Sequence, residues 1–357
     1  MACTTVYGCG SSDEEDEQDA PPVELVVDES DPAPSLEARP AEATKLELTL
    51  VAGDRFPLVK TVEQILTQSI PGRGEVVSTS KLQLQLVIGV DSIAEDGRKR
   101  FNVRYERVRY GHQIGGQQVD YDSESGQTPP PQGVLPYLGL IDNHFSFWLG
   151  ADNQLISLVG YEEFLDRCMQ HVPLSQRQYV MASLVDRAHA IERVAEFIDE
   201  GIGLLPYDAA RKNNESVVRV GDVWTRKRQV THPLPMSLQT EYKLTELDAK
   251  SAYINVRGSI NTGGALVPDA AGAVDLQSPD GMSVSLQKGF TAGYCRISRK
   301  SGLPLESRVE RQLQMRVQLD DGRSFPQTKR VITTIVASPR QADAQPVAEG
   351  PTDVRKN

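Results

Sequence analysis

"KLQLQLVIGV" (81–90) and, one short turn later, "RFNVRYERVRY" (100–110) decide the fold class of this chain. Apolar side chains recur at every second position in both stretches: Leu82, Leu84 and Leu86 in the first, and Phe101, Val103 and Tyr105 in the second. This alternation is typical of a strand with one face in the core and the other in water. The Glu-Asp-Gly sequence at 95–97 indicates a tight turn. The sequence therefore predicts an antiparallel hairpin.

Similar runs occur on both sides of a central segment. They include "KLELTLVAGDRF" (45–56), "FSFWLGADNQLISLVG" (145–160, a hairpin with its tip at "GADN"), "VRVGDVWTRKRQV" (218–230) and a long hairpin, "LESRVERQLQMRVQL" (305–319) with "TKRVITTIVAS" (328–338). A Pro-rich connection at 126–136 is excluded from the centre of a sheet, because proline cannot donate a ladder hydrogen bond. Most of the chain is therefore expected to form antiparallel strands.

The central segment has the helical period instead. "YEEFLDRCMQHV" (161–172) places apolar residues on one side of a short helix that ends before Pro173. A capping box, Ser175 with Gln178, precedes a longer run with the 3.6-residue period. We expect amphipathic helices at about 161–171 and 175–200, packed on the sheet.

Together these patterns predict an α+β fold, with a mainly antiparallel, curved β-sheet in two related halves and the two helices packed on it. "VAGDRF" (51–56) and "RVGDVW" (219–224) open the two halves in a similar way, which suggests duplication. The expected division is a disordered acidic leader (1–43), a first β-rich half (44–160), a helical insert (161–213), a second β-rich half (214–338) and a disordered tail (339–357).

The acidity of the chain belongs to its leader. The net charge is −11, and residues 1–43 carry all of it, with twelve acidic residues against one base, Arg39. The remainder is neutral overall and therefore has no net field to attract nucleic acid or an anionic membrane. We predict that nucleic acid is not a partner.

The first residues resemble the lipobox of bacterial lipoproteins, "VYGC" (6–9) followed by small and acidic residues. This resemblance implies that Cys9 is lipidated and that the leader tethers the domain to a membrane. A secretion signal needs an apolar stretch of about 7–15 residues, whereas eight residues precede Cys9. We therefore expect that the true start lies upstream; otherwise the protein is cytoplasmic with an acidic tail.

Catalytic motifs are not found. Paired carboxylates stand at turns or helix starts, and "DYDSESG" (120–126) lacks the final Glu of a calcium loop. His144 with Asp142 is a weak metal pair, better explained as a loop histidine. Cys168 and Cys295 are expected to be buried apolar residues, with a disulfide between them in an oxidising compartment as the alternative. We predict no catalytic residues, no metal site and no cofactor.

The ligand-binding residues stay unassigned. Several aromatic residues are expected in the core, with a ligand cavity as the alternative: Phe145, Phe147, Trp148, Phe164 and Trp224.

The whole pattern resembles an uncharacterised bacterial cell-envelope family with a lipoprotein-like β-clam fold. Besides the Gly-Asp opening of each half, the matching stretches are "FSFWLGADNQLISLVGYEEFLDRC" (145–168), "IGLLP" (202–206) and "SRKSGLPLESRVER" (298–311). The resemblance supplies no catalytic residue. It implies a non-catalytic envelope protein that binds an apolar ligand or another envelope component. A scaffolding protein without a small ligand is the alternative, and an enzyme of unknown class is the third. A large apolar cavity would favour the first of these.

Overall fold

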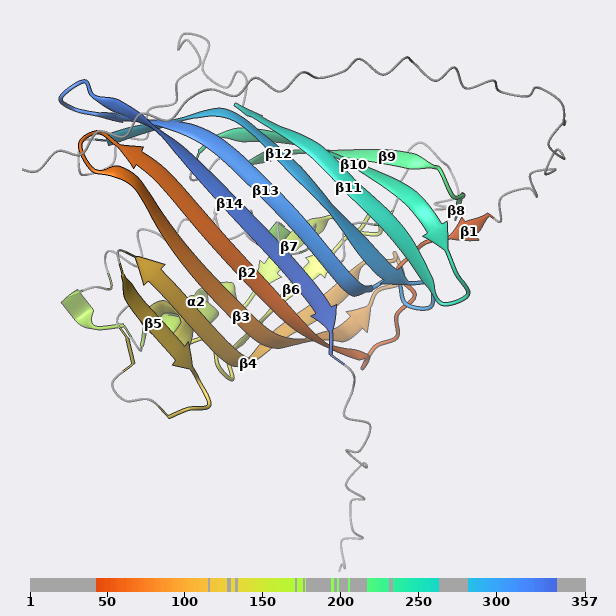
Figure 1. Cartoon of the computed structure of the whole chain (residues 1–357). Coiled ribbons are helices and arrows are strands. Elements are labelled where there is room, and N and C mark those ends of the chain that lie inside the picture. The colour runs from red at the N-terminus through yellow and green to blue at the C-terminus, as the bar shows by residue number, and fades with distance from the viewer. Residues whose placement is uncertain are drawn as a thin grey trace, which may run out of the picture. The chain divides into compact units, whose positions relative to one another are not determined.

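The structure is a computed structural model that describes residues 43–114, 116–126, 130–131, 134–170, 172–175, 177, 194–195, 198, 205, 217–230, 234–262 and 282–338. Antiparallel strands dominate these residues (Figure 1). The strands form two stretches of sequence, 44–159 and 217–337. The first stretch contributes β1 (Thr44–Lys45), β2 (Arg55–Ile70), β3 (Gly74–Ile93), β4 (Lys99–Ile114), β5 (Gln117–Asp122), β6 (His144–Leu149) and β7 (Leu155–Val159). The second contributes β8 (Val217–Val218), β9 (Val223–Val230), β10 (Met236–Leu247), β11 (Ser251–Thr262), β12 (Met282–Ser298), β13 (Pro304–Leu319) and β14 (Ser324–Ala337).

One curved 12-stranded sheet holds all of these strands except the short β1–β8 pair. Its order is β7-β6-β4-β3-β2-β14-β13-β12-β11-β10-β9. β5 pairs with residues 109–114 of β4, beyond the part of β4 that pairs with β6. The two stretches meet where β2 pairs with β14, from Leu58 opposite Ala337 to Gln68 opposite Gln327. The first and last long strands of the chain are thus neighbours in the middle of the sheet (Figure 1).

The predicted hairpins are confirmed. β3 and β4 are antiparallel neighbours joined at 94–98, where Gly97 has a positive φ of 84° that favours glycine. β6 and β7 pair across the "GADN" turn, and β13 and β14 pair across 320–323. Local alternation and turn chemistry were sufficient to specify these three hairpins.

The predicted α+β class is wrong, because the structure is mostly one large antiparallel sheet. The helices described over their whole length are α1 (Leu135–Leu138) and α2 (Tyr161–Met169), and only α2 is amphipathic. α2 lies where a helix was expected, whereas the predicted helix at 175–200 lies largely outside the described residues. The sheet is also longer than the apolar alternation suggested, because β2 and β3 continue through polar residues such as "TVEQ" (61–64) and "STS" (78–80). β-branched residues are suited to such half-buried positions.

The expected strand at 45–56 is a second correction. Only Thr44 and Lys45 form a strand there before β2 begins at Arg55, and 46–50 lie in no strand. Leu46, Leu48 and Leu50 are nevertheless buried and the residues between them are not, so the alternation reflects burial rather than pairing. This segment packs against the β12–β13 turn, where the Thr49 amide donates to the Ser301 carbonyl at 3.2 Å.

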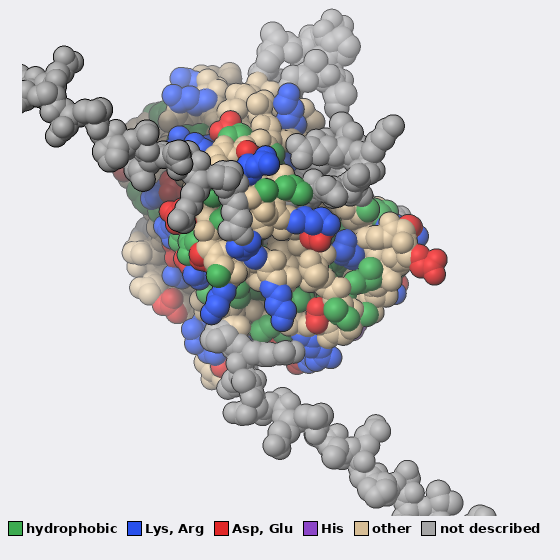
Figure 2. Space-filling model, turned by 90° about the vertical axis from the view of Figure 1, so that its right-hand side faces the viewer, with side chains coloured by type: hydrophobic (Ala, Val, Ile, Leu, Met, Phe, Trp, Pro, Cys, Tyr) green, Lys and Arg blue, Asp and Glu red, His purple; other side chains and the backbone are tan. Residues whose placement is uncertain are grey.

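The core lies on one face of the sheet, which we call the inner face. It includes strand residues such as Leu86, Phe101 and Ile254, together with Phe164 and Cys168 of α2. A separate small cluster lies at the other end of β9–β13: Val230, Leu234, Leu238, Ile260, Leu286 and Met315. On the molecular surface shown in Figure 2, hydrophobic side chains form small separate groups among Lys, Arg, Asp and Glu.

Candidate functional site

An apolar pocket of about 280 Å³ opens where β2 begins, β14 ends and the chain turns from β12 to β13. Leu58, Ile88 and Leu303 in its wall are buried. The remaining lining residues are Arg55, Phe56, Pro57, Ser298, Ser301, Pro304, Leu305, Ala337 and Ser338. Most of this wall is hydrocarbon, with one cation and three hydroxyls. Such a lining suits an apolar group whose polar end is held by few contacts.

The pocket is built from segments that are far apart in the sequence. The register opposes Leu58 to Leu86 on one side and to Ala337 on the other, which aligns these residues on the inner face. The Ser338 amide donates to the Pro57 carbonyl at 2.9 Å and extends the β2–β14 pairing past the last strand. The β12–β13 turn is fixed by the Ser298 amide, which donates to the Leu303 carbonyl at 2.9 Å. The pocket is therefore held by backbone pairing.

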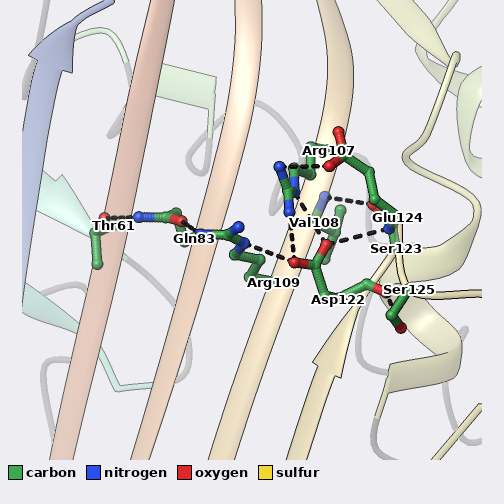
Figure 3. A network of polar contacts seen from close by, with 9 residues as sticks. All are labelled: Thr61, Gln83, Arg107, Val108, Arg109, Asp122, Ser123, Glu124 and Ser125. Atoms are coloured by element: carbon green, nitrogen blue, oxygen red, sulfur yellow. Dashed lines mark hydrogen bonds and ion pairs between the residues drawn. The ribbon is translucent and has the colours of Figure 1, made fainter. Parts of the chain in front are cut away.

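A polar network lies on the opposite, outer face of β3, β4 and β5 (Figure 3). The Arg107 guanidinium pairs with Asp122 through Nε at 2.9 Å and Nη2 at 2.5 Å. Arg109 Nε donates to the same carboxylate at 2.8 Å, and Arg107 Nη1 lies 2.5 Å from the Glu124 carboxylate. Gln83 links Arg109 to the Thr61 hydroxyl. These contacts tie the β4–β5 hairpin to β3 and β2.

The titration of Asp122 follows from this arrangement. Hydrogen bonding by Arg107, with further donation from the Glu124 amide and Arg109, holds the pKa of the Asp122 carboxyl well below its usual range. Paired arginines favour the ionised carboxylate in this way. A carboxylate so tightly paired is a structural anchor and not a proton donor near neutral pH.

The network borders an open groove of about 600 Å³, lined among others by Lys81, Gly111 and Asp120.

A second polar centre joins α2 to the sheet. The buried Asn143 amide donates to the carbonyls of Gly139 at 2.9 Å and Phe164 at 3.1 Å. Its oxygen accepts from Arg167 Nε at 2.6 Å and from the His144 amide at 2.9 Å. All described contacts of Asn143 are thus internal, and its role is to fix the helix.

The aromatic residues singled out in the sequence belong mainly to the core. Phe147 is fully buried and stacks on Phe101 at 5.3 Å between ring centroids, and Phe145 packs against Phe164 at 5.1 Å. Trp224 is partly buried and stacks on Tyr242. Trp148 points to the outer face, where Arg98 lies over its ring at 5.7 Å. The expectation of core packing is confirmed for the three phenylalanines.

The other candidate residues are also placed by the structure. Cys168 and Cys295 are free and buried, as expected, and burial raises the pKa of the Cys168 thiol to about 11. Asp142 pairs with Arg104 at 2.7 Å rather than with His144 in any described contact. The Cys9 prediction lies outside the described residues. In the part of the chain that the structure describes, there is no group of three or more His, Cys, Asp or Glu side chains that could hold a metal ion.

Sequence reasoning missed both the apolar pocket and the Asp122 network. The carboxylate spacing of "DYDSESG" does not reveal the network, because the arginine partners of Asp122 lie on a neighbouring strand and share no motif with it. The pocket has no local signal, because it combines residues near 57, 88, 303 and 337.

None of the described helices has the length and apolar composition needed to cross a bilayer.

The fold therefore defines a class: an antiparallel β-protein built on one curved sheet with an apolar inner face. The chain belongs to DUF6263, a family of unknown function, whose profile matches residues 96–304, more than half of the chain. This agrees with the expected resemblance to an uncharacterised family. Comparison with curated proteins finds no match.

Solved structures give distant likenesses. A structure of lipovitellin, titled for its lipid–protein interactions, has 10% identity and a TM-score of 0.40, covering 82% of this chain and 26% of its own. This chain thus spans about a quarter of the lipovitellin chain. The outer membrane protein OprD from Pseudomonas aeruginosa has 7% identity and a TM-score of 0.19, covering 83% of this chain and 97% of its own. Both TM-scores are low, and neither structure bears on what this chain does.

Proposed function

We propose that this chain is a non-catalytic protein of the bacterial cell envelope that binds an apolar ligand in the pocket between β2, β14 and the β12–β13 turn. The observation that carries the proposal is the lining of that pocket, which is hydrocarbon with a few polar groups. At about 280 Å³ it is slightly smaller than the pockets of about 300–1,000 Å³ that enclose drug-sized ligands. It therefore suits one acyl-chain end or a small ring system.

The polar groups of the pocket suit an amphiphile. Arg55 and the hydroxyls of Ser298 and Ser301 line the same cavity as Leu58 and Leu303. A ligand with an apolar body and one anionic or hydrogen-bonding end would use both kinds of wall. A binding role rather than a catalytic one is also supported by the described acids whose pKa is lowered, since each is held by hydrogen bonds that stabilise a turn or an ion pair.

The proposal includes the membrane anchor. A lipid on Cys9 would hold the chain at a bilayer, and the acidic residues of 1–43 would form the tether between that lipid and the folded part. We also propose that the two β-rich stretches arose by duplication. Mass spectrometry of protein made in its native host, from a gene that includes the upstream region, tests the anchor. An acylated N-terminal Cys9 is expected, and an unmodified Cys9 would exclude the anchor.

A pair of adjacent residues tests the pocket. Ala337 lines it, whereas the neighbouring Val336 is 42% exposed on the outer face. Ala337→Phe should fill the cavity, and Val336→Phe is the matched control. The affinity for the fluorescent fatty acid cis-parinaric acid should fall at least about ten-fold in the first variant only, which corresponds to about 1.4 kcal/mol. No binding by the native protein, or equal binding by both variants, would contradict the assignment.

A scaffolding function is the second candidate, and one observation favours it. Along the described strand order, β7 and β9 each have a strand on one side only. Open strand edges can pair with a partner's strand. Proline substitutions in β9 that abolish capture of an envelope protein, together with an Ala337→Phe variant that behaves as wild type, would favour the scaffold over the carrier.

A further inference from the structure

The outer face of β9–β12 carries two exposed aromatic side chains in an unusual setting. Phe290 is 45% exposed and Tyr294 is 42% exposed, and both project from β12 away from the core. Ala292 lies between them on the same face and is also exposed. Most large apolar residues of this sheet are buried on the inner face. These two therefore form an apolar strip on the side of the sheet that otherwise faces water.

Basic side chains surround this strip. Arg257 lies directly opposite Ala292 in the register, and Lys288 precedes Phe290 on β12. Lys227 and Lys243 extend the same face across β9 and β10. All four are exposed, and none of the described side-chain hydrogen bonds or ion pairs involves their charged groups. We call Phe290, Tyr294 and these four bases the outer patch.

The charge of the outer patch is positive although the folded part of the chain is neutral. Glu241, which lies opposite Arg257 on β10, is the acid at its centre. Glu306 is already engaged, since it accepts from the Tyr294 hydroxyl at 2.8 Å and pairs with Arg296 at 3.6 Å. Glu310, opposite Ala292 on β13, pairs with Arg330 at 2.6 Å, and Glu246 lies on the same face of β10 opposite Tyr253. Four bases against two acids without a described partner, Glu241 and Glu246, still leave an excess of positive charge beside the exposed aromatic rings.

We propose that the outer patch docks on an anionic lipid surface. Phe and Tyr rings partition to the interface between headgroups and hydrocarbon, and Lys and Arg are attracted to acidic headgroups. The proposal rests on the envelope location proposed above, because a chain held at a bilayer samples that surface at high effective concentration. It is separate from the apolar pocket, which opens on the inner face of the sheet.

A single-stranded nucleic acid is the other polyanion that aromatic and basic side chains recognise. Such proteins use a groove that tracks the phosphate backbone and stacks successive bases. The outer patch lies on the convex face of the sheet. The groove described on that face, next to Lys81 and Asp120, belongs to β3–β5. The geometry of the patch therefore favours a broad surface over a strand of nucleic acid.

The test uses the full chain with Cys9→Ser, so that no lipid anchor contributes. Sedimentation with vesicles of phosphatidylcholine alone, and of phosphatidylcholine with an equal amount of phosphatidylglycerol, measures the partitioning. We expect binding to the anionic vesicles at least about ten-fold stronger than to the neutral ones, and weaker binding as salt screens the charges. Phe290→Ser and Lys243→Gln should each reduce it several-fold. Val336→Ser, also on the outer face and 42% exposed, is the matched control.

Three results would overturn the proposal: equal binding to both vesicle types, unchanged binding by Phe290→Ser and Lys243→Gln, or an equal loss in Val336→Ser. Binding to oligothymidylate but not to vesicles would reassign the patch to nucleic acid. Failure here leaves the anchor and the pocket untouched, because those are tested by the mass of Cys9 and by the Ala337→Phe variant.

Discussion

Two glycines with nearly the same positive φ should respond very differently to substitution by alanine. Gly302 in the β12–β13 turn has a φ of +75°, and Gly322 in the β13–β14 turn has a φ of +80°. A Cβ on Gly322 would meet no atom within 4 Å. A Cβ on Gly302 would overlap the Glu47 carbonyl oxygen and lie 2.8 Å from its carbonyl carbon.

The magnitudes follow from this contrast. In Gly322→Ala, only the left-handed backbone should be unfavourable, which lowers the free energy of unfolding by about 1–2 kcal/mol. Gly302→Ala should lose the same free energy of unfolding, and the new Cβ should also displace the segment that carries Leu46, Leu48 and Leu50. Full release of three buried leucines would cost about 4.5–9 kcal/mol, at about 1.5–3 kcal/mol each. A partial displacement should therefore bring the total for Gly302→Ala to about 3 kcal/mol or more.

Urea unfolding followed by tryptophan fluorescence measures both free energies of unfolding. Native-state hydrogen exchange adds a local readout, because the Thr49 amide donates to the Ser301 carbonyl. Its protection should fall in Gly302→Ala and persist in Gly322→Ala. Equal destabilisation by the two variants, with Thr49 still protected in both, would refute the role given to the close approach between Gly302 and Glu47.

Three further predictions concern stability and reactivity. The wild-type free energy of unfolding should fall as the pH drops from about 5 toward 2, because Asp122 has a depressed folded pKa and its stabilisation is lost on protonation; urea midpoints of Asp122→Asn should depend less on pH. Asn143→Ala leaves buried carbonyls without a donor and should cost about 2–4 kcal/mol in urea unfolding, against less than about 1 kcal/mol for the partly exposed Asn102→Ala, and similar values would contradict the role of Asn143. In a variant whose two N-terminal cysteines are serine, Cys168 and Cys295 should resist a thiol reagent at mildly alkaline pH until urea unfolds the chain, since burial raises both pKa values; rapid labelling of the native protein would show that they are accessible.

The hairpins were predictable because each depends on neighbouring residues. The alternation of Leu84 and Leu86, and of Phe101 and Val103, fixes which side faces the core, and Gly97 fixes the turn. Most of β2 had no such signal. Residues 59–68 are half-buried on both faces, and their strand conformation depends on β3 and β14, which approach from far along the sequence.

The segment at 46–50 shows the limit of periodicity. Alternating leucines indicate which side chains are buried, but they do not reveal whether the backbone pairs with a strand. Here the neighbour is a turn near Ser301, which no local pattern identifies. The apolar pocket was invisible for the same reason, because Leu58, Ile88, Leu303 and Ala337 meet only after the whole sheet has formed.

The pairing of β2 with β14 also sets the order in which the chain can fold. During synthesis, β2 leaves the ribosome long before β14, and at about 5–20 residues per second the wait is on the order of tens of seconds. Throughout that time the β2 edge that β14 will cover has no partner. Sequence-distant pairing is intrinsically slow. The growing chain thus exposes a long unpaired strand edge, which can pair with another chain until β14 is made.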